Sequence, residues 1–426
     1  MEQKYIKRNG FYVFLLGTMA YMFSYIGRMN YSACLNSMVG EGLFTTEFGG
    51  YISTAYMIVY GSGQMINGLF GRKFSSKYMV FFGLFGAGIM NVLICLVDNK
   101  FAIMTVWALN GLFMSMLWAP IIKAFAEWIE EEDRKKYAVR LSVSIPIGTI
   151  ISYLIPAIYL DRSSWRTVFF ICGGCLFFAS VVWIVGTTLI GKYISSMTES
   201  FKSREAEALE TVSDGKKVSL VSLIFGCALF VVMCGVMFNG SLKDALANWV
   251  PTYIVNTYGL SDSYSATISM IIPAITIFGT FIASKIDRKY FDNEIYTASV
   301  MFFTATVALL FVVFTKNIDG MVGGFVTTFL IAVAISAMWG ANTMFLSMVP
   351  YRFANIGMAS SVTGFLNCFA YFSSALCSSI YGVVAENSGW NTVSFVWVAM
   401  GLGGTLVCLF GGRVWKNKLV LNNLAK

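Results

Sequence analysis

The feature that most constrains this chain is a series of long apolar segments that recurs along its 426 residues. The hydrocarbon core of a bilayer is about 30 Å thick, so a helix needs about 20 predominantly apolar residues to cross it. At that length the sequence contains twelve candidate spans, at roughly 11–38, 48–70, 78–97, 101–128, 138–160, 166–190, 219–257, 263–284, 295–315, 321–348, 354–384 and 392–412. We therefore predict an all-α membrane protein with twelve transmembrane helices.

The composition supports this prediction and excludes several classes of function. Charged residues make up 12% of the chain, against about 25% in an ordinary soluble protein. Histidine is absent, which excludes histidine-based catalytic triads and histidine-ligated metals. The nine cysteines all lie in apolar segments, which argues against a disulfide framework. We find no nucleotide-binding motif and no nucleophile–base or metal constellation, so we expect a protein that is not an enzyme and needs no cofactor.

The positions of the basic residues predict the topology. Of the 30 lysines and arginines, 23 lie at the two termini or in alternate loops, and only four lie in the other loops. By the positive-inside rule, both termini are cytoplasmic and the number of spans is even. The net charge of +8 therefore reflects topology rather than nucleic-acid binding. Short outer loops favour a multi-pass protein of a bacterial plasma membrane. We also expect a monomer.

One long polar stretch, residues 191–218, separates the sixth and seventh candidate spans. It predicts a cytoplasmic linker between two six-helix halves, residues 1–190 and 219–426. The halves look like a repeat, because Trp165 and Trp390 open the sixth and twelfth spans in similar contexts, 225 positions apart.

Two further pairs of residues recur at similar offsets. Trp118 and Trp339 are 221 positions apart, and Arg28 and Lys243 are 215 positions apart. Two six-helix halves in parallel repeat are typical of secondary transporters, which bind their substrate near the midplane of the membrane.

Charged side chains inside the spans are candidates for function. Each costs at least about 2.5–3.5 kcal/mol on insertion scales, so each needs a reason to be there. The candidates well inside spans are Arg28, Lys123, Lys243 and Asp244. Because three are cations and one is an anion, we expect an anionic substrate.

Arg28 is the strongest candidate of the four. Tyr21, Tyr25 and Arg28 are spaced i, i+4 and i+7, so they share one face of a helix. A guanidinium fork near phenolic hydroxyls suits a bidentate phosphate, sulfonate or carboxylate. The alternative is an arginine that extends to a lipid headgroup.

The other charged residues allow both functional and structural interpretations. Lys243 and Asp244 are adjacent in the sequence, and adjacent side chains do not face each other on an α-helix. Lys243 is therefore expected to bind substrate, and Asp244 is expected to act in coupling or in a salt bridge. The alternative for either residue is a structural salt bridge with a group elsewhere in the chain. Lys123 lies near the inner end of its span, where it could bind substrate or extend to the membrane surface.

The chain resembles a known family over most of its length. The twelve spans, the linker and the basic cytoplasmic loops look like the major facilitator superfamily. Within it, the sequence is similar to the organophosphate:phosphate antiporters, which exchange glycerol-3-phosphate or hexose-6-phosphate for phosphate. The motifs that carry this similarity are Tyr25-Ile26-Gly27-Arg28-Met29-Asn30, Asn248-Trp249-Val250-Pro251-Thr252-Tyr253 and Val362-Thr363-Gly364-Phe365.

The resemblance implies roles for particular residues. It makes Arg28 one of two cations that bind phosphate, with Tyr21, Tyr25, Tyr60 and Trp118 as neighbours. Lys243 falls on the second cation, which is usually arginine, and a lysine offers a point charge rather than a fork.

Two positions depart from the family pattern. Gln64 stands where a glycerol-phosphate carrier has a lysine, and Ile145 stands where it has a histidine. A phosphonate, a sulfonate or another organic anion therefore stays open as the substrate.

Together these observations predict a secondary transporter of an organic anion that works by alternating access. A phosphate ester is the favoured substrate, and inorganic phosphate is the favoured exchange partner. One alternative is proton-coupled symport of a phosphonate, sulfonate or carboxylate, with Asp244 as the proton carrier. Another is a transporter-like receptor that binds sugar phosphate and signals to a partner.

Overall fold

The computed structural model describes residues 2–70, 74–129, 137, 140–141, 144–194, 228–353 and 359–421. Within these ranges the chain is helical and contains no strand. Nine of its helical stretches are long and apolar enough to cross a membrane, alongside the shorter apolar helix α7 (Ser144–Tyr159). This arrangement is consistent with the twelve predicted segments. The predicted linker lies outside the described residues beyond Ile194.

Contacts between helices divide the chain into two compact units. The first unit comprises Met1–Tyr31 and Val59–Gly215, and the second comprises Ser32–Ile58 and Lys216–Lys426. The boundaries cut α1 (Glu2–Gly40) and α2 (Thr46–Phe70). Residues 32–58 therefore pack with the second unit, whereas the sequence repeat assigns them to the first half.

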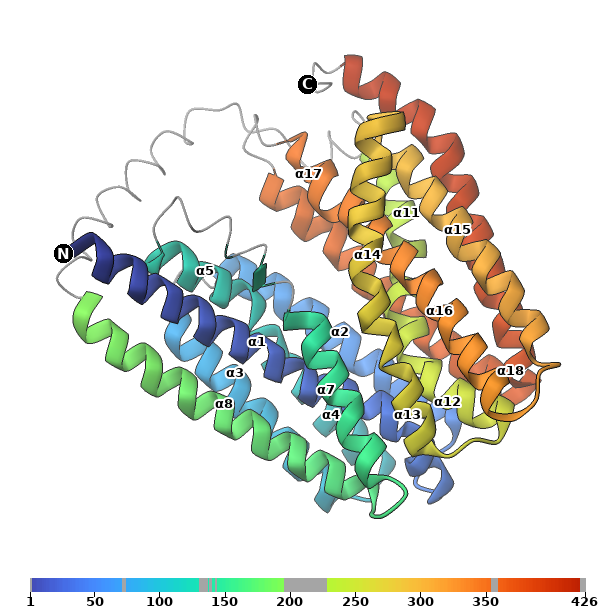
Figure 1. Ribbon diagram of the computed structural model, residues 1–426, viewed down its shortest axis with the longest axis horizontal. Helices are drawn as coiled ribbons and strands as arrows, with labels where there is room; N and C mark the ends of the chain where they lie inside the picture. Colours follow the sequence, from blue (N-terminus) through green and yellow to red (C-terminus); the bar gives the residue numbers. More distant parts are fainter. Residues whose placement is uncertain are drawn as a thin grey trace. The chain divides into compact units, whose positions relative to one another are not determined.

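In the first unit, α3 (Ser76–Leu93) packs against α4 (Lys100–Ser115) and α8 (Trp165–Ile194) (Figure 1). Helix α4 ends at Ser115 and α5 (Trp118–Trp128) begins after a short break. Pro120 accounts for the break, because proline lacks the N–H of a helical residue and its ring clashes with the carbonyl group four positions earlier. As a result, Trp118 stands at the start of a new helix.

In the second unit, α11 (Leu229–Gly240) continues through the π-helical turn η3 (Ser241–Ala245) into α12 (Leu246–Tyr258). The following helices are α13 (Asp262–Ser269), α14 (Ile271–Ile286), α15 (Glu294–Thr315), α16 (Gly320–Thr343), α17 (Val349–Tyr351) and α18 (Ala359–Leu421). Helix α16 packs on α14 and α15, and α18 packs on α11 and α15 (Figure 1). Helix α18 spans the last two predicted segments and breaks at Gly389, whose φ of 77° favours glycine.

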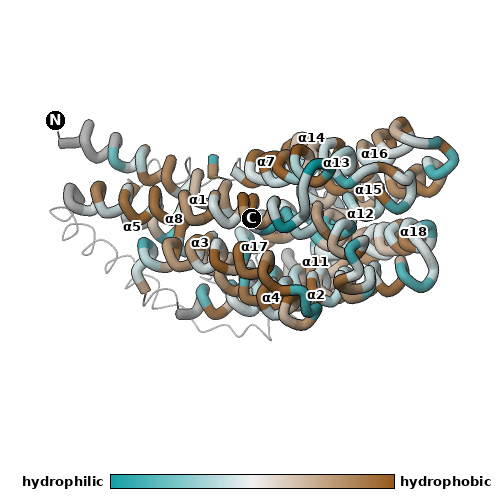
Figure 2. Tube along the Cα trace, turned by 90° about the horizontal axis from the view of Figure 1, so that it is seen from below, coloured by the Kyte–Doolittle hydropathy of each residue, from teal (hydrophilic) through white to brown (hydrophobic). Residues whose placement is uncertain are grey.

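Apolar side chains are exposed along the helices of both units. On α8 the exposed set is Phe170, Phe178, Val181, Val185 and Leu189. Figure 2 shows hydrophobic residues along most helices and hydrophilic residues mainly near turns and ends. Exposed apolar rows on helices whose backbone groups are satisfied internally suit contact with lipid. The protein is therefore a multi-pass membrane protein.

The ends of α1 and α2 that belong to the second unit are held by polar contacts. Asp262, at the start of α13, accepts hydrogen bonds from Asn36 Nδ2 at 3.1 Å and from the Ser37 hydroxyl. The Thr46 backbone N–H donates to Glu386 Oε2 at 3.0 Å. These contacts explain why residues 32–58 group with the second unit.

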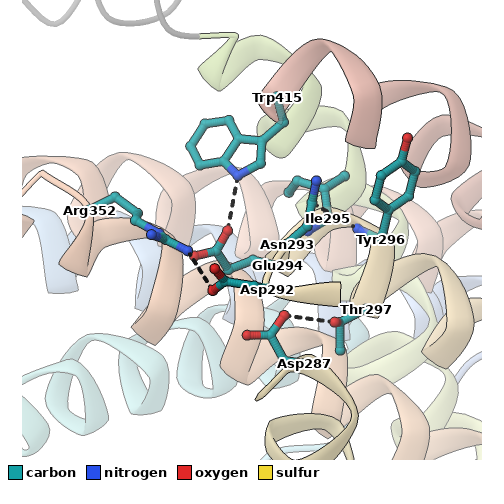
Figure 3. Close-up of polar contacts among 9 residues, drawn as sticks. All are labelled: Asp287, Asp292, Asn293, Glu294, Ile295, Tyr296, Thr297, Arg352 and Trp415. Atoms are coloured by element: carbon teal, nitrogen blue, oxygen red, sulfur yellow. Dashed lines mark hydrogen bonds and ion pairs between the residues drawn. The ribbon is translucent and has the colours of Figure 1, made fainter. Parts of the chain in front are cut away.

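A second polar cluster joins α15, the segment after α17 and the end of α18 (Figure 3). The Asn293 side chain caps α15 and donates to the Gly412 carbonyl oxygen at 3.0 Å. Next to it, the buried Glu294 carboxylate accepts from Arg352 Nε at 2.7 Å and from Trp415 Nε1 at 3.0 Å. This cluster fixes three helix ends of the second unit to one another.

Candidate functional site

Arg28 lies among tyrosine rings in the first unit. Its guanidinium carbon is 4.7 Å from the centre of the Tyr60 ring and 5.7 Å from the centre of the Tyr25 ring. Tyr25 and Tyr60 are themselves buried. A guanidinium held over aromatic faces gains cation–π attraction and keeps N–H donors in a fixed plane. It can therefore offer those donors to an anion.

Three other predicted residues extend this group of side chains. Tyr21 packs on Tyr25, with ring centres 5.5 Å apart, and on Trp118, with ring centres 4.8 Å apart. Gln64 Nε2 donates to the Tyr60 hydroxyl at 2.8 Å. We call Arg28, Tyr21, Tyr25, Tyr60, Gln64 and Trp118 the Arg28 cluster; all six positions were predicted from the sequence.

Buried asparagines hold α1 next to Arg28. Asn91 Nδ2 donates to the Gly27 carbonyl oxygen at 3.2 Å, and Asn110 Nδ2 donates to the same oxygen at 3.1 Å. Asn30 Nδ2 donates to Asn91 Oδ1 at 2.8 Å. Separating buried amides from their hydrogen-bond partners costs free energy. This network therefore fixes the position of α1 along its axis and its rotation within the first unit. These asparagines were not predicted from the sequence, where their signal is polarity within apolar spans.

Helix α7 also sets the position of α1 through close packing. A Cβ atom added at Gly148 would lie 2.3 Å from the Met22 carbonyl oxygen and 2.9 Å from Tyr25 Cβ. Nearby, the Ser152 hydroxyl donates to the Ile26 carbonyl oxygen at 3.3 Å. The backbones of α1 and α7 can approach this closely only because residue 148 is glycine.

Lys123 contacts a different part of the first unit. Its ammonium group donates to the Phe74 carbonyl oxygen at 2.9 Å, in an exposed region just beyond α2. This contact joins the segment just before α3 to α5. Substrate binding by Lys123 stays a prediction.

In the second unit, Lys243 and Asp244 form an ion pair. Lys243 Nζ donates to Asp244 Oδ1 at 2.9 Å and Oδ2 at 2.8 Å. The expectation that these adjacent side chains do not face each other is wrong. They lie in the π-helical turn η3, where bonding to the fifth residue widens the turn and reduces the rotation per residue. The two long side chains can then converge.

Two residues of α16 complete this group. Lys243 Nζ lies 4.6 Å from the centre of the Trp339 ring, and Asn239 Nδ2 donates to Asn342 Oδ1 at 3.2 Å. We call Lys243, Asp244, Trp339, Asn239 and Asn342 the Lys243 cluster. Sequence analysis did not propose Trp339 or Asn342 as site residues. The signal that could have found Trp339 is its repeat partner Trp118, which lies in the Arg28 cluster.

Comparison with known proteins identifies the family. The model of the Major Facilitator Superfamily matches residues 17–376. The chain belongs to this superfamily. Solved structures agree with the fold: a bacterial homologue of the human lysosomal transporter Spinster has a TM-score of 0.77 at 12% identity, covering 97% of this chain and 98% of that chain. The nucleoside transporter NupG has a TM-score of 0.70 at 14% identity, covering 94% of this chain and 98% of that chain.

Curated relatives confirm the resemblance to the organophosphate:phosphate antiporters. The probable hexose phosphate transport protein of Chlamydia trachomatis is 22% identical over 92% of this chain and 87% of its own length. The glycerol-3-phosphate transporter of Bacillus subtilis is 23% identical over 90% of this chain and 88% of its own length. The membrane sensor protein UhpC of Salmonella typhimurium is 20% identical over 92% of this chain and 89% of its own length.

Proposed function

We propose that this major facilitator protein is a secondary transporter, not an enzyme, that carries a phosphate ester across the membrane in exchange for inorganic phosphate. Arg28 binds the phosphate group, and Lys243 supplies the second cation. Its location is a bacterial plasma membrane, with both termini in the cytoplasm, and it works as a monomer. The names of the curated relatives support the substrate class.

The observation that carries this proposal is the setting of Arg28. Its guanidinium lies over the rings of Tyr25 and Tyr60 on a span, Asn9–Gly40, that carries no other charged residue. A cation inside a membrane span is costly, and binding an anion offsets that cost. A guanidinium fork matches two oxygens of a phosphate group, which a point charge does not.

Exchange follows from the same electrostatic argument. A positively charged binding site that holds no substrate resists the conformational change that exposes it to the other side of a low-dielectric membrane. A bound anion neutralises Arg28 and eases that change. The transporter then reorients faster with phosphate or phosphate ester bound than when it is empty, which couples the two anions.

The test is uptake of radiolabelled glycerol 3-phosphate into proteoliposomes that contain the purified protein. We expect uptake to depend on phosphate inside the vesicles, and Arg28→Lys to lose most of it because the point charge cannot bind two oxygens. Arg166→Lys is the matched control, since Arg166 pairs with Asp98 at an exposed site. Normal uptake by a correctly folded Arg28→Lys protein would contradict the role of Arg28.

Two other outcomes would support different functions. Accumulation driven by a pH gradient alone, without internal phosphate and lost in Asp244→Asn, would establish proton symport. Binding of glycerol 3-phosphate without any transport would establish a receptor, the function that the name of the UhpC relative indicates for that protein.

A further inference from the structure

We propose that Asp244 and Asn239 determine specificity, because they make the Lys243 cluster bind anions that carry hydroxyl groups in preference to anions that lack them. This inference rests on the proposed transport of an organic anion. It concerns residues of the second unit, and it assigns a role to the carboxylate that lies beside the second cation.

The Asp244 carboxylate already pairs with the Lys243 ammonium group. Both carboxylate oxygens accept from Lys243 Nζ, at 2.9 and 2.8 Å, and the side chains are 15% and 9% exposed. The centre of the Trp339 ring also lies 4.6 Å from Lys243 Nζ. Lys243 is therefore neutralised internally, and an incoming anion has to compete with a carboxylate that is tethered to the next residue.

The free-energy cost of displacing Asp244 from Lys243 depends on the ligand. When an anion takes the Lys243 ammonium, the Asp244 carboxylate loses its donors in a largely buried place. A buried charge that loses its partner is strongly unfavourable. The loss is made up only if the ligand brings its own donors to the carboxylate, and hydroxyl groups are such donors.

Asn239 adds a second acceptor with the same preference. Its side chain is 1% exposed, and its Oδ1 atom accepts no hydrogen bond within the described part of the chain. It lies one helical turn before Lys243, and its Nδ2 atom is already used by Asn342. A buried acceptor without a donor is unfavourable. A ligand hydroxyl would satisfy it, whereas a ligand without hydroxyls would leave it as it is.

The experiment compares two phosphate monoesters that differ only in hydroxyl groups. Glycerol 3-phosphate and propyl phosphate have the same three-carbon skeleton and the same charged group. Their dissociation constants are measured by calorimetry on the purified full-length protein in detergent. We expect the wild type to prefer glycerol 3-phosphate by about tenfold or more, the discrimination that one or two hydrogen bonds to a charged or buried acceptor provide.

The variants separate the two acceptors. Asp244→Asn removes the resident counter-ion, so we expect tighter binding of propyl phosphate and a ratio of dissociation constants that falls to about one-fifth or less of the wild-type value. Asn239→Leu should lower the ratio without tightening propyl phosphate. Asp319→Asn, an exposed aspartate before α16, is the matched control and should leave both constants unchanged.

Each result decides the question. Equal binding of the two esters by the wild type, or an unchanged ratio in a folded Asp244→Asn protein, overturns the proposal. If Asp244→Asn does not fold, Asn239→Leu decides instead, and an unchanged ratio in that variant also overturns it. Binding of neither ester by the wild type refutes the proposed function itself, which is a distinct outcome.

Discussion

The buried contacts of Glu294 with Arg352 and Trp415 give the sharpest prediction about stability. Glu294 is 2% exposed and accepts from Arg352 Nε at 2.7 Å and from Trp415 Nε1 at 3.0 Å (Figure 3). Burial lowers the pKa of the Arg352 guanidinium, but the hydrogen bond and the charge of Glu294 outweigh this effect and raise the pKa above its ordinary value. The guanidinium therefore stays charged, and it needs the carboxylate.

Glu294→Gln keeps the shape of the side chain and removes its charge. Removing one partner of a buried ion pair costs about 3–5 kcal/mol. Here Asp292, which is exposed, lies 3.5 Å from Arg352 and can supply part of the missing charge. One of the two donors also meets the amide nitrogen, which cannot accept. We therefore expect a loss of about 2–4 kcal/mol in the free energy of unfolding of the second unit.

The matched control is an ion pair that is just as short but exposed. Arg166 Nη2 lies 2.6 Å from Asp98 Oδ1, with side chains 32% and 75% exposed. Asp98→Asn should cost only about 0–1 kcal/mol, because water screens such pairs. Equilibrium unfolding in mixed micelles measures both variants. Equal losses of unfolding free energy in Glu294→Gln and Asp98→Asn would refute this reasoning. They would show that the distance between the charged atoms, and not their burial, determines the contribution of an ion pair.

Two further predictions concern the helices that carry the site. Gly148→Ala places a Cβ atom 2.3 Å from a carbonyl oxygen of α1, so we expect a loss of about 1–3 kcal/mol and weaker binding of glycerol 3-phosphate. At Gly174 an added Cβ atom would meet no atom within 4 Å beyond its own stretch of helix, so Gly174→Ala should be neutral or slightly stabilising in the same calorimetric and unfolding measurements. In a background without native cysteines, Ser37→Cys with Asp262→Cys should form a disulfide, since the native side chains are hydrogen-bonded. Oxidation should raise the free energy of unfolding of the second unit and reduction should reverse the gain, because the disulfide ties residue 37 to α13 within that unit; an unchanged free energy of unfolding after full oxidation would contradict this.

The first cluster was largely predictable from the sequence because α1 is regular where it carries the site. Tyr21, Tyr25 and Arg28 follow the helical period, so their shared face could be derived from spacing alone. Tyr60, Gln64 and Trp118 came from the family resemblance, because they lie on other helices and no spacing rule connects them to Arg28. The grouping of residues 32–58 with the second unit could not be predicted, because it depends on side-chain contacts between helices far apart in the sequence.

The second cluster shows why local irregularity limits such predictions. An α-helical period predicts that the side chains of Lys243 and Asp244 point in different directions. The π-helical turn changes both directions, and no distinctive residue in the sequence marks this turn. The internal sequence repeat indicates site residues that the helical period does not. Trp118 packs on Tyr21 in the helix that carries Arg28, and its repeat partner Trp339 packs on Lys243. Both units thus place a tryptophan beside the helix that carries the candidate cation. In the second unit the Lys243 ammonium also pairs with the Asp244 carboxylate at 2.8 Å, so an anion that binds Lys243 has to displace that counter-ion.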